Sequence, residues 1–382
     1  MMTSSKRFLP CFILVVVILL CVFTVSLMTY SLFFIQREVE QTFGKAPAHL
    51  DPPQKLRFQV LLYVHRKTLL TPLNPNAPLQ SFTISPNEPT QRILQRLAEE
   101  GIISDPQALQ IFMQYQNYDT QIQSGEHLLS PAMSPQQIAQ ALIDPANLLI
   151  QFNLLAGWRN EEVAAALAAS GLSFSAQAFL DAADQPLELF LPQRISTASI
   201  RNLQGFLMPA TYRLLKNASP EELLSLFTQN FNTQVTTELE HKFQEQGLSL
   251  YEGIILASIV QRESMLEEEM PLIASVFLNR LRAQMKLDSD ATVQYALGYN
   301  EAQKTWWTNP LSTADFSIDS PYNTYRYAGL PPTPICNPGL TAIRAVAEAP
   351  QTDYFYFRAA CDGSGRHLFA NTYAEHLENA CP

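Results

Sequence analysis

Residues 251–269 read YEGIILASIVQRESMLEEE, and this segment determines how the C-terminal half of the chain is interpreted. On a helix, Glu263 falls on an apolar stripe together with Leu256, Ile259, Leu266 and Met270. A carboxyl group with aliphatic side chains one turn away is costly to ionise, so its pKa should rise. A raised pKa suits a residue that donates a proton near neutral pH. The segment therefore predicts a helix with a candidate acid at Glu263.

The next predicted helix, Pro271–Met285, offers a second interpretation of Glu263. Its arginines Arg280 and Arg282 could simply pair with the carboxylate, because ion-pair networks often imitate active sites. The spacing of the residues leaves both interpretations open.

A polar loop with Asp288 and Asp290 follows this helix. The two aspartates could bring a second carboxylate near Glu263. They could instead cap a helix that begins at Ala291 or Thr292, and capping is the more common use of aspartate at such a position.

Two loops further along, Ser320–Tyr325 and Gly329–Pro332, are rich in aromatic, amide and proline residues, and Trp306 and Trp307 precede them. Aromatic faces stack well on sugar rings, and the Asn323 amide can both donate to and accept from an acetamido group. These loops indicate a carbohydrate site, with an ordinary rigid loop packed on the core as the alternative.

The C-terminal residues predict a β-hairpin. Residues 353–358 and 367–369 read as strands around a turn at 363–365, which places His367 near the tip. His367 and His376 are nine residues apart and have no obvious third partner, so a metal site is disfavoured and no cofactor is expected.

Three cysteines lie in the C-terminal part of the chain, at Cys336, Cys361 and Cys381. They allow one disulfide in three possible pairings, and the sequence does not choose among these. The absence of a C-x-x-C or short Cys/His spacing favours structural roles over zinc binding or nucleophilic chemistry.

The N-terminal run at residues 8–35, FLPCFILVVVILLCVFTVSLMTYSLFFI, has no ionisable group apart from thiols and a tyrosine hydroxyl. It exceeds the apolar region of a signal peptide, about 7–15 residues, and as a helix it can span the roughly 30 Å hydrocarbon layer. Lys6 and Arg7 precede the run, while Glu38 and Glu40 follow it. The positive-inside rule predicts a cytoplasmic stub at 1–7, a single transmembrane helix at 8–35 in the cell inner (plasma) membrane, and a periplasmic or extracytoplasmic body.

The charge of the chain restricts the function of this body. The 382 residues include 25 basic and 35 acidic side chains, a net charge of −10, and the part after the apolar run carries −12 because it lacks Lys6 and Arg7. Such acidity argues against a nucleic-acid binder. The length also favours two or three folding units.

The region between the apolar run and Glu263 is predicted to contain smaller parts. A polar stalk ends in Asp51-Pro52-Pro53, and Leu56–Tyr63 reads as a first strand. The fold class is therefore α+β, with one transmembrane helix, a small α+β module and a mixed α/β domain. The predicted boundaries are 36–79 for the stalk and first strand, 80–145 for the module, 146–245 for a connecting α+β part and 246–382 for the core.

Several blocks of this sequence resemble the YceG-like endolytic murein transglycosylases. The matching residues are Gly205-Phe206, Pro209, Thr211-Tyr212, Ala257–Val260, Glu263, Val276-Phe277, Asn279–Leu281, Met285, Leu287, Asp290, Thr292, Ser320–Tyr325, Gly329–Pro332, Asn337–Gly339, Tyr356-Phe357, Gly365, His367 and Phe369. Ordered blocks over such a length are more specific than any single block. The module at 80–145 resembles the LysM-like module of this family, though more weakly.

The resemblance implies a lyase, a lytic transglycosylase that cleaves the β-1,4 bond between N-acetylmuramic acid and N-acetylglucosamine in nascent glycan strands of peptidoglycan. Glu263 would act as general acid and base, and the 6-hydroxyl of the sugar would attack to leave a 1,6-anhydro end. The implied role is termination of glycan elongation, with peptidoglycan synthases (penicillin-binding proteins) as possible partners. We expect substrate contacts from Asn279, Asp290, Thr292, Tyr322, Asn323, Tyr325 and His367.

The sequence also departs from the family pattern, which leaves substrate binding open. Gln204, Ala210 and Gln261 stand where acids are usual, Ala291 stands where proline is usual, and Thr333 replaces a glycine. Two other hypotheses therefore remain. One is a non-catalytic peptidoglycan-binding scaffold for cell-wall synthases, and the other is a hydrolase that uses Glu263 with Asp290 and water.

Overall fold

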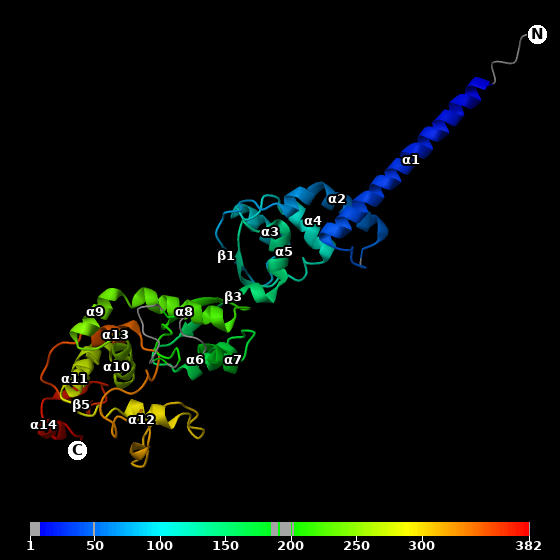
Figure 1. Ribbon diagram of the computed structural model, residues 1–382. Helices are drawn as coiled ribbons and strands as arrows, with labels where there is room; N and C mark the ends of the chain where they lie inside the picture. Colours follow the sequence, from blue (N-terminus) through cyan, green and yellow to red (C-terminus); the bar gives the residue numbers. More distant parts are fainter. Residues whose placement is uncertain (1–7, 49, 185–189, 192–199, 201, 382) are drawn as a thin grey trace, which may run out of the picture. The chain divides into compact units, whose positions relative to one another are not determined.

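The computed structural model describes residues 8–48, 50–184, 190–191, 200 and 202–381 (Figure 1). Backbone contacts divide the chain into two compact units, Met1–Leu149 and Ile150–Pro382. Helices and strands occur in both units after one apolar N-terminal helix, so the predicted mixture of helix and sheet is confirmed. The predicted stub at 1–7 lies outside the described residues.

Helix α1 (Phe8–Phe43) continues well past the predicted end of the membrane run at residue 35. Among the described residues it is the one helix long and apolar enough to cross a membrane. Val39 and Phe43 are buried in the core of the first unit, and the N–H of Gly44 bonds the Glu40 carbonyl at 3.2 Å where the helix ends. The predicted stalk thus begins as a continuation of the apolar helix.

The strand predicted at Leu56–Tyr63 is wrong, because these residues lie in helix α2 (Pro52–Leu70). Asp51 caps this helix by accepting a hydrogen bond from the N–H of Gln54, and the Gln54 side chain accepts one from the Asp51 N–H. Pro52 occupies the first helical position, where its missing N–H costs nothing. The Asp-Pro-Pro sequence is therefore a helix start rather than the end of a stalk.

Residues 80–145 contain both strands and helices, in the order strand, helix, helix, strand, helix. Strands β1 and β2 are antiparallel, and Phe82 lies opposite His127. The helices of this region share one apolar core with the end of α1 and with α2. The elements are β1 (Gln80–Ile84), α3 (Thr90–Glu99), α4 (Pro106–Gln116), β2 (Gly125–Leu129), α5 (Pro135–Ile143) and the 3-10 helix η1 (Pro145–Asn147).

Strand β3 (Leu148–Leu154) leads from the first unit into the second. Its first two residues pair with β2, and β4 (Ala210–Leu215) is its other neighbour. The Thr211 hydroxyl of β4 donates to the Asn153 side chain of β3 at 2.8 Å. The chain forms α6 (Asn160–Ala169) and α7 (Ala176–Ala183) between these two strands, and α8 (Pro220–Gln234) and α9 (Thr237–Glu245) after them.

Helix α10 (Leu250–Glu263) lies at the centre of the second unit, and every residue from Gly253 to Val260 is buried. A helix that is apolar all round must be covered on all sides. It packs against α9, α11 (Met270–Arg282), α12 (Asp290–Leu297) and α13 (Leu340–Ala347), and Figure 1 shows α10, α11 and α13 side by side. This packing holds Glu263, the last residue of α10, at the edge of the core.

One contact in this packing requires a glycine. A Cβ atom at Gly253 would lie 2.5 Å from Cδ1 of Phe243, whose ring is fully buried on α9. The absence of a side chain at Gly253 therefore lets α9 and α10 approach each other.

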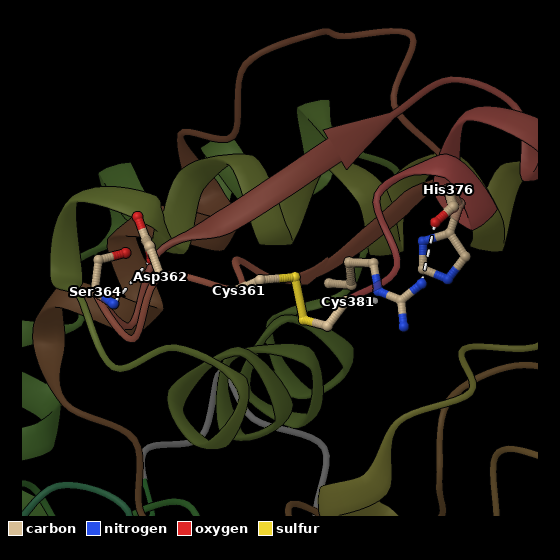
Figure 2. The surroundings of a disulfide bond; sticks show 6 residues. Cys361, Asp362, Ser364, His376 and Cys381 are labelled. Carbon is tan, nitrogen blue, oxygen red and sulfur yellow. Dashed lines mark hydrogen bonds between the residues drawn. A yellow bond between two sulfur atoms is a disulfide. The ribbon is translucent and has the colours of Figure 1, made fainter.

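The predicted C-terminal hairpin is confirmed. Strand β5 (Tyr356–Ala359) pairs antiparallel with β6 (His367–Ala370), and α14 (Tyr373–Glu378) follows. Figure 2 shows the disulfide between Cys361, which follows β5, and Cys381, which follows α14. Of the three possible pairings the structure has this one, and Cys336 is a buried free thiol.

We expect Gly253→Ala to lower the free energy of unfolding by about 1–3 kcal/mol, because the added methyl group would overlap the Phe243 ring. Thermal melting followed by circular dichroism on the full-length chain measures this loss. In the double variant Gly253→Ala/Phe243→Leu the smaller side chain makes room for the methyl group. The loss of stability in the double variant should therefore be smaller than the sum of the losses in the two single variants. Strictly additive losses would show that α9 and α10 do not meet at this point.

Candidate active site

Glu263 ends helix α10, and the chain continues at Ser264 in an extended conformation. The Ser264 hydroxyl donates to the Leu266 carbonyl at 2.6 Å and accepts from the Leu266 N–H at 3.2 Å. Such local side-chain hydrogen bonds compete with the helix. The helix predicted over residues 251–269 is therefore wrong beyond Glu263, and Leu266 does not continue its apolar stripe.

Two hydrogen-bond donors at the start of α12 act on the partly buried carboxyl group of Glu263. The Ser289 hydroxyl donates to Oε1, and the backbone N–H of Ala291 also hydrogen-bonds with the carboxyl group. Both donors favour the charged form of the acid. The candidate acid therefore lies where the end of one helix meets the beginning of another.

The environment of Glu263 shifts its pKa in two directions. Burial raises the pKa to about 7, and the negative charge of Asp290 adds to this rise. The hydrogen bonds from Ser289 and Ala291 and the positive charge of Arg280 oppose it. Burial has the larger effect, so the pKa remains raised. At neutral pH the protonated and the ionised form of Glu263 are therefore both populated.

Neither of the arginines considered as partners holds Glu263 in an ion pair within the described chain. Arg280 donates to the carbonyls of Leu287 and Phe355, each at 2.7 Å. Arg282 donates to the side chain of Gln246 at 2.9 Å. Arg280 thus fixes two backbone segments, and the pairing interpretation of Glu263 is wrong.

The two aspartates of the loop do not cap α12. Ser289 is the N-cap residue, and Asp290 is the first residue of the helix. The exposed Asp290 accepts a hydrogen bond from the Tyr325 hydroxyl at 2.6 Å, and burial together with this carboxylate raises the pKa of Tyr325. Asp288 instead lies 3.6 Å from Arg280. Of the two, Asp290 is therefore the one whose charge acts on Glu263.

Thr292 and Asn323 hold together the loops that carry Asp290 and Tyr325. The buried hydroxyls of Thr292 and Thr324 are 2.8 Å apart. The buried Asn323 amide donates to two backbone carbonyls at 2.9 Å, and its oxygen accepts from the Tyr325 N–H at 3.0 Å. The polar atoms of the Asn323 side chain are thus all hydrogen-bonded within the protein. Of the residues expected to contact the substrate, Asp290 and Tyr325 are joined by a hydrogen bond beside Glu263.

Asn279 and His367 take part in other hydrogen-bond networks. The Asn279 amide donates to the carbonyls of Thr352 and Tyr354 at 2.8 and 2.9 Å. His367 lies in β6, and its Nδ1 atom is 2.8 Å from a carboxylate oxygen of Glu269. These contacts attach the chain before β5, and β6 itself, to the helical core, and the hydrogen bonds of the described residues do not link Asn279 or His367 to Asp290 or Tyr325.

Sequence reasoning missed Ser289 and Thr324. The signal for Ser289 was its place between two aspartates before a helix, but that pattern predicts capping of the helix rather than a contact with Glu263. Thr324 lies in the loop that was singled out for its aromatic and amide groups, and nothing in the sequence predicts its hydrogen bonds to Thr292 and to the Ser289 N–H.

The departures from the family pattern have structural roles of their own. Gln261 accepts a hydrogen bond from the Gly339 N–H at 2.9 Å, at the start of α13. Gln204 accepts one from the Asn160 N–H at 2.9 Å, and the Thr333 and Tyr322 hydroxyls are 2.7 Å apart. Ala291 supplies an N–H toward Glu263 that a proline could not offer. Ala210 begins β4, and nothing in the structure explains the change there.

Comparisons with known proteins identify the family to which the chain is similar. The YceG-like family matches residues 82–381. An endolytic murein transglycosylase of Bacillus subtilis (strain 168) is 28% identical over 326 residues, which cover 82% of this chain and 88% of that protein. One of Streptococcus pneumoniae serotype 2 (strain D39 / NCTC 7466) is 28% identical over 315 residues, which cover 76% of this chain and 55% of that protein.

A solved structure is also similar. The 2.6 Å crystal structure of a yceG-like protein, lmo1499, from Listeria monocytogenes superposes with a TM-score of 0.52 at 26% identity. The match covers 79% of this chain and 99% of that one. The family match extends over residues 82–381, which is well over half of the 382 residues. This chain therefore belongs to the YceG-like family.

Proposed function

We propose that the chain is a membrane-anchored endolytic lytic transglycosylase of peptidoglycan, with Glu263 as general acid and base. The observation that carries this proposal is the position of Glu263 at the end of the buried helix α10, where Ser289 donates to its carboxyl group and burial raises its pKa to about 7. A group with such a pKa can give a proton and take one back at neutral pH. The names of the relatives from Bacillus subtilis and Streptococcus pneumoniae support the same reaction.

In the proposed reaction the protonated Glu263 gives its proton to the glycosidic oxygen while the bond between that oxygen and C1 of N-acetylmuramic acid breaks. The carboxylate that results takes the proton of the 6-hydroxyl as O6 of the same sugar attacks C1. The ring closes to a 1,6-anhydro end, and Glu263 is protonated again. One carboxyl group suffices because neither water nor an enzyme nucleophile enters.

Asp290 and Tyr325 are the proposed substrate contacts closest to this chemistry. Asp290 is exposed beside Glu263, and the Tyr325 hydroxyl fixes its carboxylate at 2.6 Å. A fixed carboxylate can accept hydrogen bonds from sugar hydroxyls or amides. We propose that Thr292, Tyr322, Asn323, Asn279 and His367 act indirectly, by holding the loops and the hairpin around this pair.

The position of the enzyme in the cell is part of the proposal. The apolar helix α1 supports a single anchor in the cell inner membrane, and the Cys361–Cys381 disulfide fits an extracytoplasmic, oxidising location of the second unit. The strand, helix, helix, strand order at 80–145 is compatible with a LysM-like glycan-binding module. In this location the enzyme would terminate the elongation of glycan strands beside peptidoglycan synthases.

We expect Glu263→Gln to abolish the release of anhydro-ended fragments from uncross-linked glycan strands by the full-length chain in detergent. The amide keeps an oxygen for the Ser289 and Ala291 donors but cannot give a proton at neutral pH. Mass spectrometry identifies the product, since a hydrolase would yield fragments heavier by one water molecule.

Thermal melting is the control for this variant. An ionised carboxyl with a pKa raised by burial destabilises the folded state, so Glu263→Gln should melt at or above the wild-type temperature at pH 8. Undiminished turnover by a folded Glu263→Gln variant contradicts the proposal. Glycan binding without product, by wild type and variant alike, would favour a non-catalytic scaffold.

We expect kcat/KM to fall as the pH rises through about 7, because Glu263 must be protonated in the free enzyme. Asp290→Asn removes a negative charge that raises the pKa of Glu263, so this fall should begin at lower pH in the variant. Glu267→Gln is the matched control, since it removes an exposed carboxylate that is not among the groups with the largest effect on the pKa of Glu263. An unchanged profile in Asp290→Asn would show that the group titrating in the rate profile is not Glu263.

A further inference from the structure

We infer that Ser289 is a positioning residue for Glu263. Its hydroxyl donates to Oε1 of the acid and thereby keeps the transferable proton on Oε2. This inference rests on the proposed function of Glu263. Ser289 thus assists Glu263 in the reaction, and Oε2 is the carboxyl oxygen that faces the glycosidic bond.

The hydroxyl of Ser289 is not used as its position in the sequence suggests. Serine at an N-cap normally accepts a hydrogen bond from an N–H in the first turn of its helix. Ser219 of α8 and Ser249 of α10 do so, each within a capping box. Ser289 occupies the N-cap position of α12 and makes no such bond, and its hydroxyl instead points to Glu263, where it donates to Oε1. The start of α12 is thus left without its side-chain cap in favour of the acid.

The backbone of Ser289 is held from both sides, so that only the direction of its hydroxyl remains to be set. Its side chain and backbone are almost fully buried, at 1% exposure. Its N–H donates to the Thr324 hydroxyl at 3.0 Å, and its carbonyl accepts from the Thr292 hydroxyl at 2.7 Å. The two threonine hydroxyls are themselves 2.8 Å apart. This closed ring of hydrogen bonds fixes the donor relative to the acid.

The contact determines where the proton of Glu263 resides. The oxygen of a carboxylic acid that carries no proton is the better acceptor, so donation by Ser289 to Oε1 places the acidic proton on Oε2. Oε2–H then gives its proton to the glycosidic oxygen, and Oε2 later receives the proton of the 6-hydroxyl. Ser289 keeps its own proton throughout. Its hydrogen bond strengthens when Glu263 becomes a carboxylate, and therefore favours proton release.

The test compares kcat, KM and the pH profile of wild type with those of Ser289→Ala, using the full-length chain and uncross-linked glycan strands. Loss of a hydrogen bond to a charged group should lower kcat by about 10- to 100-fold while KM stays within about twofold. Because the lost donor opposes the rise in pKa, the fall in kcat/KM at alkaline pH should move to higher pH. Ser289→Thr keeps the hydroxyl, so its alkaline fall should remain at the wild-type position.

Ser219→Ala is the matched control. It removes a serine at an ordinary N-cap, and should lower the melting temperature without changing kcat or the pH profile. A Ser289→Ala variant that behaves in this way has lost only a structural serine, and overturns the inference. So does a shift of its alkaline fall to lower pH, because Ser289 would then accept the proton of Glu263 instead of donating.

The outcomes separate this inference from the proposed function. If wild type releases no anhydro product, or if Glu263→Gln retains turnover, the proposed function fails and the inference fails with it. If Glu263→Gln is inactive and Ser289→Ala matches wild type in kcat and pH profile, only the inference fails.

Discussion

The second unit is organised around the cost of placing one carboxyl group at the edge of an apolar helix. Glu263 follows a run of buried residues in α10, and burial alone would favour its neutral form. A carboxyl with no donors in such a place would stay neutral and give up its proton reluctantly. The start of α12 supplies donors that offset part of this cost, through Ser289 and Ala291. The balance leaves the acid near the middle of its titration at neutral pH.

Bringing these groups together requires segments that are distant in the chain. The loop before α12 is tied to the aromatic loop by Thr292, Thr324 and the Asp290–Tyr325 hydrogen bond. Arg280 reaches the same loop from α11, where it bonds backbone carbonyls and lies 3.6 Å from the carboxylate of Asp288. Buried charges need such partners. The polar residues near Glu263 therefore have two roles. Some shift the pKa of the acid, and others only hold the loops in place.

Part of this arrangement could be predicted from the sequence and part could not. Local patterns predicted the helix that ends at Glu263 and the C-terminal hairpin, because spacing and turn residues encode them directly. The helix at α2 was missed because Asp51-Pro52-Pro53 resembles a linker as much as a helix start. The end of α10 depends on the hydroxyl of Ser264, and the role of Ser289 depends on whether its hydroxyl accepts from an N–H of α12 or donates to Glu263. Competition between local and tertiary hydrogen bonds is settled only in three dimensions.

The uninterrupted helix α1 has a mechanical consequence for the proposed membrane anchoring. Val39 and Phe43 insert into the core of the first unit, so no flexible joint separates this unit from the apolar segment. A helix advances about 1.5 Å per residue, and the residues from 36 to 43 therefore provide a spacer of about 12 Å. A disordered linker would let the first unit sample many heights above the lipid surface. In the proposed anchoring, a helix that ends inside the unit instead fixes the distance between that unit and the bilayer surface.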